Sequence, residues 1–273
     1  MGSDKKLVNI FVNRNEKSCQ IADIVEKKLE ENGFKVSEDF NEKAIFNICI
    51  GGDGAFLRAV HKTNYSKIPF CGINTGHLGF YQEILIPNID QFIEDLKSEN
   101  FSMEKLYLVD ANIYFKNSDQ VKTEKALNEF VVRSNESNIV YLDVHIDDHH
   151  LQTFAGDAMV ISTPSGSTAY NFSAGGAILY HNLDGIQMTP VAPINSKAYR
   201  SLLNPVVIPG KSKITTYFRE SSTLGSETKI YGDGLDKTYE DISHVSFSKS
   251  TTYINRLVFE NEWYWVNIKD KFL

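Results

Sequence analysis

Positive charge and cysteine are both scarce in this sequence, and the two shortages limit what the protein can do. The 273 residues carry 28 Lys and Arg against 35 Asp and Glu, a formal net charge of −7. Partners such as nucleic acid or an anionic membrane require a basic face, so we expect neither. The three cysteines, Cys19, Cys49 and Cys71, are odd in number and widely spaced. This pattern favours reduced thiols in a cytoplasmic protein.

Long apolar segments and several common motifs are also absent. The first residues lack the apolar stretch and cleavage site of a signal peptide. Residues 158–183 have no Asp, Glu, Lys or Arg, but they are too rich in Ser, Thr and Gly for a bilayer span. No G-x-G-x-x-G fingerprint, Walker loop or G-x-S-x-G nucleophile elbow occurs. An uncharged, hydroxyl-rich segment is more typical of a surface that faces a ligand.

The first hundred residues alternate between strand and helix patterns. Apolar runs predict strands at 6–12, 45–50 and 69–73, and helical periodicity predicts helices at 18–32, at about 55–61 and after Asn88. Such alternation predicts a parallel sheet covered by helices, with ligands bound at the carboxyl ends of its strands. We expect an α/β domain of residues 1–100, joined by the C-terminal tail 256–273.

From about Tyr107 the pattern changes to short β-branched or aromatic runs separated by turn residues. Strands are expected at 107–115, 126–133, 140–146, 149–154, 157–162, 212–218 and 229–231. Asp147-Asp148 is expected to form a hairpin turn, and only the stretch after Gly166 is helical. Residues 101–255 should therefore form a mostly antiparallel β domain, for which a sandwich is one arrangement.

A glycine-rich loop, Gly51-Gly52-Asp53-Gly54, follows the apolar run that ends at Ile50. Glycine lets a backbone approach a ligand closely, and the helix that follows directs its free N–H groups at an anion. The Asp53 carboxylate would repel phosphate, so it must hold a metal or take a proton from an attacking hydroxyl. A sharp turn without chemistry is the alternative.

Two further segments carry polar groups suited to a nucleotide. In the run Ser162–Gly176, a short helix would expose Tyr170 and Ser173 on one face, which suits a sugar and a flat base. The pair Asn128-Glu129 suits the vicinal hydroxyls of a ribose. A plain loop and a solvated strand pair are the respective alternatives.

Together these motifs resemble the NAD kinase family. The resemblance rests on the Gly51–Gly54 loop, the loop Asn74–Phe80, the pair Asn128-Glu129 and the run Ser162–Gly176. It is completed by Ala192-Pro193-Ile194-Asn195 and Gly232-Asp233-Gly234. These motifs span residues 51 to 234, and the run after Ser162 separates the chain from lipid kinases that share the glycine loop.

The resemblance implies transfer of the γ-phosphoryl group of ATP to the 2′-hydroxyl of the adenosine ribose of NAD, which makes NADP. Mg²⁺ or another divalent cation is expected to accompany ATP, and no metal ligand is assigned. Asp53 is implied as the catalytic base, with Gly51, Gly52 and Gly54 as the phosphate-binding backbone. A homodimer or homotetramer is expected, with the site completed across subunits.

The residues implied in NAD binding come from several segments. They are Phe80, Asn128, Glu129, Asp157, Thr168, Ala169, Tyr170, Ser173, Ala192, Ile194 and Tyr199, with Asp233 as a further candidate. Of these, Ala192, Ile194 and Tyr199 are expected to act across the subunit interface.

The sequence departs from the family pattern at three alanines. Ala55 stands where threonine is usual, and Ala158 replaces a usual glycine. Ala155 stands where some members carry arginine, so we hypothesise that NADH is accepted as well as NAD. A catalytically silent NAD-binding regulator and a lipid kinase are the alternative functions. The choice between ATP and polyphosphate as donor, and between dimer and tetramer, stays open.

Overall fold

The computed structural model describes residues 6–77, 79–134, 138–196, 200–219, 228–260 and 263–273. The chain divides into two compact units. Unit 1 consists of residues 1–105 and 253–273, and unit 2 of residues 106–252. The chain passes between them inside two long strands, β6 (Ser102–Phe115) and β17 (Ile242–Val258). The boundaries expected from the sequence lie a few residues from these.

Unit 1 contains a parallel sheet. Its strands are β1 (Lys6–Val12), β2 (Phe34–Ser37), β3 (Phe46–Gly51), β4 (Phe70–Asn74) and β5 (Ile84–Leu85), in the order β2-β1-β3-β4-β5. The last residues of β17 also pair in parallel with β4. Every residue of β3 and β4 is buried, and apart from Asn47 and Asn74 these strands contain no polar side chain, as is typical of a parallel sheet covered on both faces.

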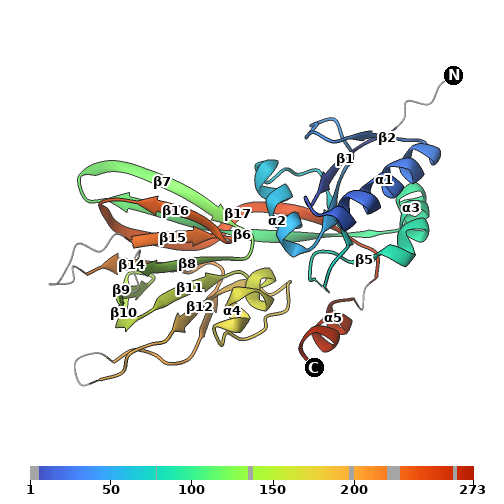
Figure 1. Ribbon diagram of the computed structural model, residues 1–273. Helices are drawn as coiled ribbons and strands as arrows, with labels where there is room; N and C mark the ends of the chain where they lie inside the picture. Colours follow the sequence, from blue (N-terminus) through green and yellow to red (C-terminus); the bar gives the residue numbers. More distant parts are fainter. Residues whose placement is uncertain (1–5, 78, 135–137, 197–199, 220–227, 261–262) are drawn as a thin grey trace. The chain divides into compact units, whose positions relative to one another are not determined.

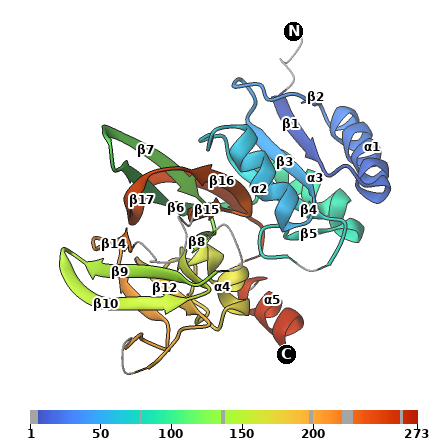
Figure 2. The ribbon, with the colours of Figure 1, turned by 60° about the vertical axis from the view of Figure 1, so that its left-hand side comes forward.

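Helices cover both faces of this sheet (Figures 1 and 2). The helices of unit 1 are α1 (Glu16–Glu31), α2 (Asp53–Lys62), α3 (Ile89–Ser98), preceded by the 3₁₀ turn η1 (Ile86–Asn88), and α5 (Trp263–Phe272). The apolar faces of α1 and α3 share one core with β1, β3 and β4. α1 begins earlier than expected because the Asn15 side chain caps it, accepting from the Ser18 N–H at 2.8 Å. The Asn88 side chain makes no capping bond.

Unit 2 is a sandwich of two antiparallel sheets around one core, as the strand pattern predicted. The first sheet contains β6, β7 (Ser118–Ala126), β9 (Val140–Ile146), β10 (His149–Gly156), β14 (Lys213–Phe218) and β17. The second contains β8 (Glu129–Ser134), β11 (Ala158–Ser162), β12 (Gly185–Val191), β13 (Val206–Pro209), β15 (Thr228–Gly232) and β16 (Leu235–Tyr239). Phe154 and Phe247 of the first sheet meet Phe130 and Met159 of the second in the core.

One predicted strand and one predicted helical stretch differ from the structure in ways that matter for the site. The run expected as one strand at 126–133 is split, since β7 ends at Ala126 and β8 begins at Glu129. Asn128 therefore lies in the connection. The helical stretch after Gly166 is only the 3₁₀ turn η2 (Ser165–Thr168) and the single-turn α4 (Tyr170–Ser173). Among the described residues, no helix combines the length and hydrophobicity needed to cross a membrane.

Candidate active site

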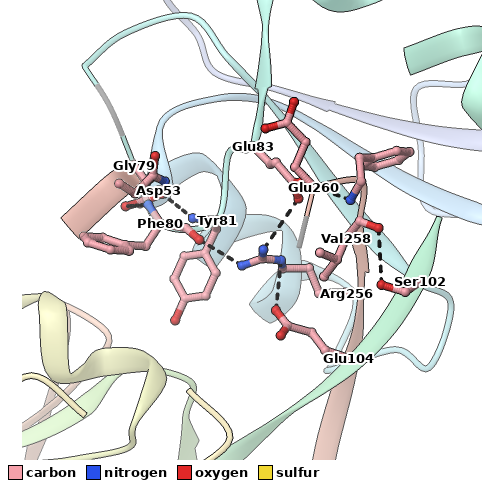
Figure 3. Close-up of polar contacts among 12 residues, drawn as sticks. Asp53, Gly79, Phe80, Tyr81, Glu83, Ser102, Glu104, Arg256, Val258 and Glu260 are labelled. Carbon is pink, nitrogen blue, oxygen red and sulfur yellow. Dashed lines mark hydrogen bonds and ion pairs between the residues drawn. The ribbon is translucent and has the colours of Figure 1, made fainter. Parts of the chain in front are cut away.

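Asp53 is the first residue of α2 and lies at the carboxyl end of β3. Its carboxylate accepts two backbone hydrogen bonds from the neighbouring loop. The Phe80 N–H donates to Oδ2 at 2.9 Å and the Tyr81 N–H to Oδ1 at 3.0 Å (Figure 3). Hydrogen bonds to an ionised acceptor are about twice as strong as neutral ones. The carboxylate is thus held in one orientation while 27% of the side chain stays exposed.

Gly79 makes this arrangement possible. A Cβ at position 79 would lie 2.3 Å from Asp53 Oδ1 and 2.8 Å from its Cγ, closer than any real Cβ contact. The loop is fixed from behind by α5, because Asn267 Nδ2 donates to the Gly79 carbonyl at 2.8 Å. Any side chain at position 79 would displace either the carboxylate or the loop.

Helix α5 also covers Phe80, the residue proposed as an apolar wall for NAD. The Phe80 ring is buried and packs at 5.8 Å against Phe272 and at 6.1 Å against Tyr264. The Lys271 ammonium lies 4.8 Å above the same ring and 3.9 Å from Asp53 Oδ2. In unit 1 taken by itself, Phe80 is therefore part of the packing around Asp53.

The glycine loop presents its backbone at the start of α2. Gly51 must lack a side chain, since a Cβ there would lie 2.7 Å from the Ala55 Cβ and 2.9 Å from the Asn13 Cβ. Gln82, which is fully buried, donates to the Gly52 carbonyl at 3.0 Å. Free N–H groups at the start of a helix are in general suited to bind an anion.

A cavity of about 710 Å³ opens in unit 1 beside this helix. Arg58 and Lys62 of α2 and Arg14 of the β1–α1 loop bring cations to it, whereas Asp23 and Glu26 bring carboxylates from α1. The Arg58 guanidinium is oriented by a hydrogen bond to Asn13 Oδ1 at 2.7 Å. The cavity has the volume of a small-molecule pocket. The side of the cavity that carries Arg58 adjoins the glycine loop.

In unit 2, the Asp233 carboxylate organises the connection that carries Asn128. It accepts from the N–H groups of Leu127 and Asn128, each at 2.7 Å, and more distantly from Glu129 at 3.4 Å. Asp233 and Gly234 form the two-residue turn between β15 and β16 with φ of 52° and 75°. This turn type favours an Asp-Gly pair, so the local sequence fixes where the carboxylate lies.

Glu129, one residue further on, is an unusual buried acid. Its side chain is only 6% exposed, and its Oε2 has no hydrogen-bond partner among the described residues. Burial, reinforced by the negative charge of Asp233, raises the pKa of Glu129 to about 8. The carboxyl is therefore mostly protonated at neutral pH. It can donate as well as accept a hydrogen bond.

The run Ser162–Gly176 divides into a buried framework and an exposed face. Thr163 Oγ1 donates to the Leu127 carbonyl at 2.6 Å and accepts from the Gly166 N–H at 3.0 Å. A Cβ at Gly166 would lie 2.1 Å from the Asn128 carbonyl oxygen. The hydroxyl-rich turn is thus locked onto the Asn128 connection, while Tyr170 (45% exposed) and Ser173 face outward.

The other NAD-binding candidates of unit 2 lie near the end of β10. Asp157 is exposed, and its N–H donates to the Val191 carbonyl at 3.1 Å. The Ile194 N–H donates to the Ala155 carbonyl at 2.7 Å, which brings the Ala192–Ile194 segment beside this strand end. Thr168 is buried and Ala169 partly buried. Tyr199 lies outside the described residues.

Two protein-family models together match most of this sequence. The family model described as ATP-NAD kinase N-terminal domain matches residues 35–101, and the one described as ATP-NAD kinase C-terminal domain matches residues 127–257. The NAD kinase of Finegoldia magna is 60% identical over the whole of both chains. The chain belongs to the NAD kinase family. Its activity is that of an enzyme, an ATP-dependent phosphotransferase that converts NAD to NADP.

More distant NAD kinases are also similar to this chain, in sequence or in structure. The NAD kinase of Streptococcus gordonii is 32% identical over 99% of this chain and 96% of its own length. A yeast NADH kinase complexed with NADH superposes with a TM-score of 0.83 at 20% identity, covering 98% of this chain and 88% of that one. An NAD kinase from Archaeoglobus fulgidus in complex with ATP gives 0.74 at 22% identity, covering 97% of each. These two likenesses establish the NAD kinase fold.

Several residues that hold the loop around Asp53 were not predicted from the sequence. Arg256, Glu83 and Glu104 form a buried charged cluster beside the loop that holds Asp53. The position of Arg256 between the apolar residues Ile254 and Leu257 is the feature of the sequence from which a buried charge could have been predicted. Among the residues that the structure describes, no group of three or more His, Cys, Asp and Glu side chains is arranged to hold a metal.

Gly79→Ala is expected to lower kcat for NADP formation about tenfold or more, because a misplacement of about 1 Å can cost about 10²-fold. The measurement is steady-state kinetics beside thermal unfolding. Gly76→Ala in the same loop is the matched control, since a Cβ there has no neighbour within 4 Å. Equal kinetics of the two variants would contradict the role given to Gly79.

Glu129→Gln is expected to gain stability relative to the wild type as pH rises. In the wild type the native pKa is raised from 4.5 to about 8, so the unfolded state loses its proton first and native stability falls between those values. Glutamine removes this loss. Unfolding midpoints from pH 5 to 9 should diverge by a few degrees, where about 1 kcal/mol corresponds to about 2–4 °C. If the unfolding midpoints of the two proteins changed in parallel with pH, the pKa of Glu129 would not be raised in the native state.

Proposed function

We propose that Asp53 is the base that takes the proton from the 2′-hydroxyl of the adenosine ribose as the γ-phosphoryl group of ATP is transferred to it. The observation that carries this proposal is the pair of backbone hydrogen bonds that fixes the carboxylate at the start of α2. Each oxygen accepts one N–H and keeps lone pairs for a substrate hydroxyl. A positioned base contributes about 10²–10⁴ in rate.

The phosphate groups of ATP are proposed to bind at the N-terminus of α2. Gly51, Gly52 and Gly54 supply backbone that a phosphate can approach, and the helix dipole favours negative charge there. Arg14 and Arg58, which line the neighbouring cavity, would add positive charge. We propose that Mg²⁺ arrives as part of the ATP substrate, since this ion usually binds through substrate phosphates and one or two carboxylates.

NAD is proposed to bind to unit 2 through the segments that Asp233 and Thr163 lock together. The Glu129 carboxyl, with an Oε2 that has no partner among the described residues, suits a hydroxyl of the ribose. Its protonated form avoids placing a second negative charge beside the Asp233 carboxylate. Tyr170 and Ser173 would contribute an exposed ring and hydroxyl, and Asp157 would accept from the carboxamide of nicotinamide.

Three further properties complete the proposal. The resemblance to the family supports a homodimer or homotetramer, in which Ala192, Ile194 and Tyr199 act across the interface. A cytoplasmic location is supported by the three cysteines, which are free thiols. Both substrates, NAD and ATP, are small soluble molecules.

Asp53→Asn is expected to keep the fold and the affinity for NAD and to lose about 10²-fold or more in turnover, because an amide cannot take the proton. The assay is NADP formation from NAD, ATP and Mg²⁺, read through an NADP-specific dehydrogenase. Asp39→Asn is the control, since its side chain is fully exposed. Near-normal turnover by Asp53→Asn would refute the base assignment.

The chain is also proposed to phosphorylate NADH, on account of the small residue Ala155. This side chain is fully buried in β10, so the strand end carries no cationic group at that position. Initial rates with NAD and NADH under the same conditions test the proposal. Ala155→Arg should lower the NADH rate more than the NAD rate, and a wild-type NADH rate of a few per cent of that with NAD would count against it.

A further inference from the structure

Arg256 is a charged residue inside the apolar end of β17. Its side chain is 5% exposed and directs its three nitrogens at three different groups (Figure 3). Nη1 donates to the Phe80 carbonyl at 2.9 Å. Nη2 lies 3.6 Å from Glu83 Oε2, and Nε lies 3.1 Å from Glu104 Oε1. A planar guanidinium can serve all three at once, which an ammonium cannot.

Glu83 fixes the other end of the same loop. Its Oε1 accepts from the N–H groups of Phe259 at 3.0 Å and of Glu260 at 2.7 Å, just after β17. The loop from Phe80 to Glu83 is therefore attached to this strand at two places, once through a carbonyl and once through a carboxylate. Burial raises the pKa of Glu83 although the nearby guanidinium opposes the shift. Such a cluster is costly to bury unless its geometry is kept.

The contact between Arg256 and Phe80 continues to Asp53 through a single peptide bond. The carbonyl of Phe80 and the N–H of Tyr81 belong to the same planar unit, which is trans. Arg256 binds the carbonyl on one side of that unit, and Asp53 Oδ1 accepts the N–H on the other. Because the unit is rigid, rotation of the carbonyl must also rotate the N–H. A charged donor on the carbonyl also polarises the peptide and strengthens the bond that the N–H gives.

We infer that Arg256 is a positioning residue of the kinase reaction, which acts on the Asp53 carboxylate through the Phe80–Tyr81 peptide. Arg256 touches neither substrate in this assignment. It sets the direction of one of the two N–H groups that orient the base, and Glu83 and Glu104 hold it in place. The inference rests on the proposed role of Asp53.

The test is a double-mutant cycle between Arg256→Lys and Asp53→Asn. Lysine keeps a positive charge between the two glutamates but cannot keep all three contacts. Arg256→Lys should lower kcat about tenfold or more, as expected for a misplaced group, with KM for NAD and ATP changed less than about threefold. In the Asp53→Asn background the same change should have almost no further effect, because residues that act as one unit are not additive.

Asn9→Ala is the matched control for a purely structural loss. Asn9 is fully buried in β1 and donates to Asn47 Oδ1 at 2.8 Å, so its removal weakens unit 1 away from the loop that holds Asp53. Thermal unfolding ranks the variants by stability. Asn9→Ala should keep kcat within about twofold, since the hydrogen bonds that it removes, to Asn41 and Asn47, are structural and contribute about 1 kcal/mol each. The inference would be overturned if Asn9→Ala and Arg256→Lys had the same thermal stability and Asn9→Ala lost as much kcat as Arg256→Lys.

The remaining outcomes are also decisive. Normal kcat of folded Arg256→Lys beside an inactive Asp53→Asn would overturn this inference alone. Normal kcat of Asp53→Asn would overturn the base assignment and this inference with it. Equal losses from Arg256→Lys with and without Asp53→Asn would show that Arg256 acts independently of the base. If Arg256→Lys fails to fold, Glu104→Gln takes its place in the double-mutant cycle. The same losses of kcat, with and without Asp53→Asn, are then expected of Glu104→Gln.

Discussion

The carboxylate of Asp53 accepts from two consecutive backbone N–H groups, and much of unit 1 is arranged around that pair of bonds. The parallel sheet brings the end of β3 beside the loop that follows β4. Gly79 leaves space for the carboxylate, and Asn267 of α5 holds the loop from behind. A kinase base needs a fixed direction more than it needs a special environment, because phosphoryl transfer depends chiefly on positioning.

Unit 2 uses the same physical device for a different purpose. There the Asp233 carboxylate accepts from successive N–H groups and fixes the connection between β7 and β8. The negative charge that secures this backbone also acts on Glu129, whose proton it helps to retain. One carboxylate thus shapes the connection and also adds to the effect of burial, which is the main cause of the raised pKa of Glu129.

The residues proposed to carry the chemistry could be selected from the sequence because they lie in contiguous motifs. The glycine loop, the pair Asn128-Glu129 and the hydroxyl-rich run could each be interpreted locally. The fold class was predictable as well, since the strands β3 and β4 are mostly apolar and alternate with helical patterns. The charged strand β7 was missed because most of its side chains are exposed and show no alternation.

The supports of the site could not be predicted in this way, because they join residues that are far apart in the chain. No spacing rule connects Arg256 to Phe80, and the effect of a Cβ at Gly79 on Asp53 depends on a contact across 26 positions of sequence. The interpretation of Phe80 as a wall for NAD rested on the motif alone. The structure adds that α5 packs against its ring.

The discontinuous composition of unit 1 affects how the protein is made. The contact partners Phe80 and Arg256 are separated by 176 residues, and the whole of unit 2 is synthesised between them. The ribosome therefore exposes the loop that orients the Asp53 carboxylate long before the strand that anchors this loop has been translated. Until then Glu83 has neither its guanidinium nor its two backbone donors. The Asp53 carboxylate can acquire its final orientation only near the end of synthesis, so an incomplete chain that already carries the glycine loop would not yet hold this carboxylate as the full chain does.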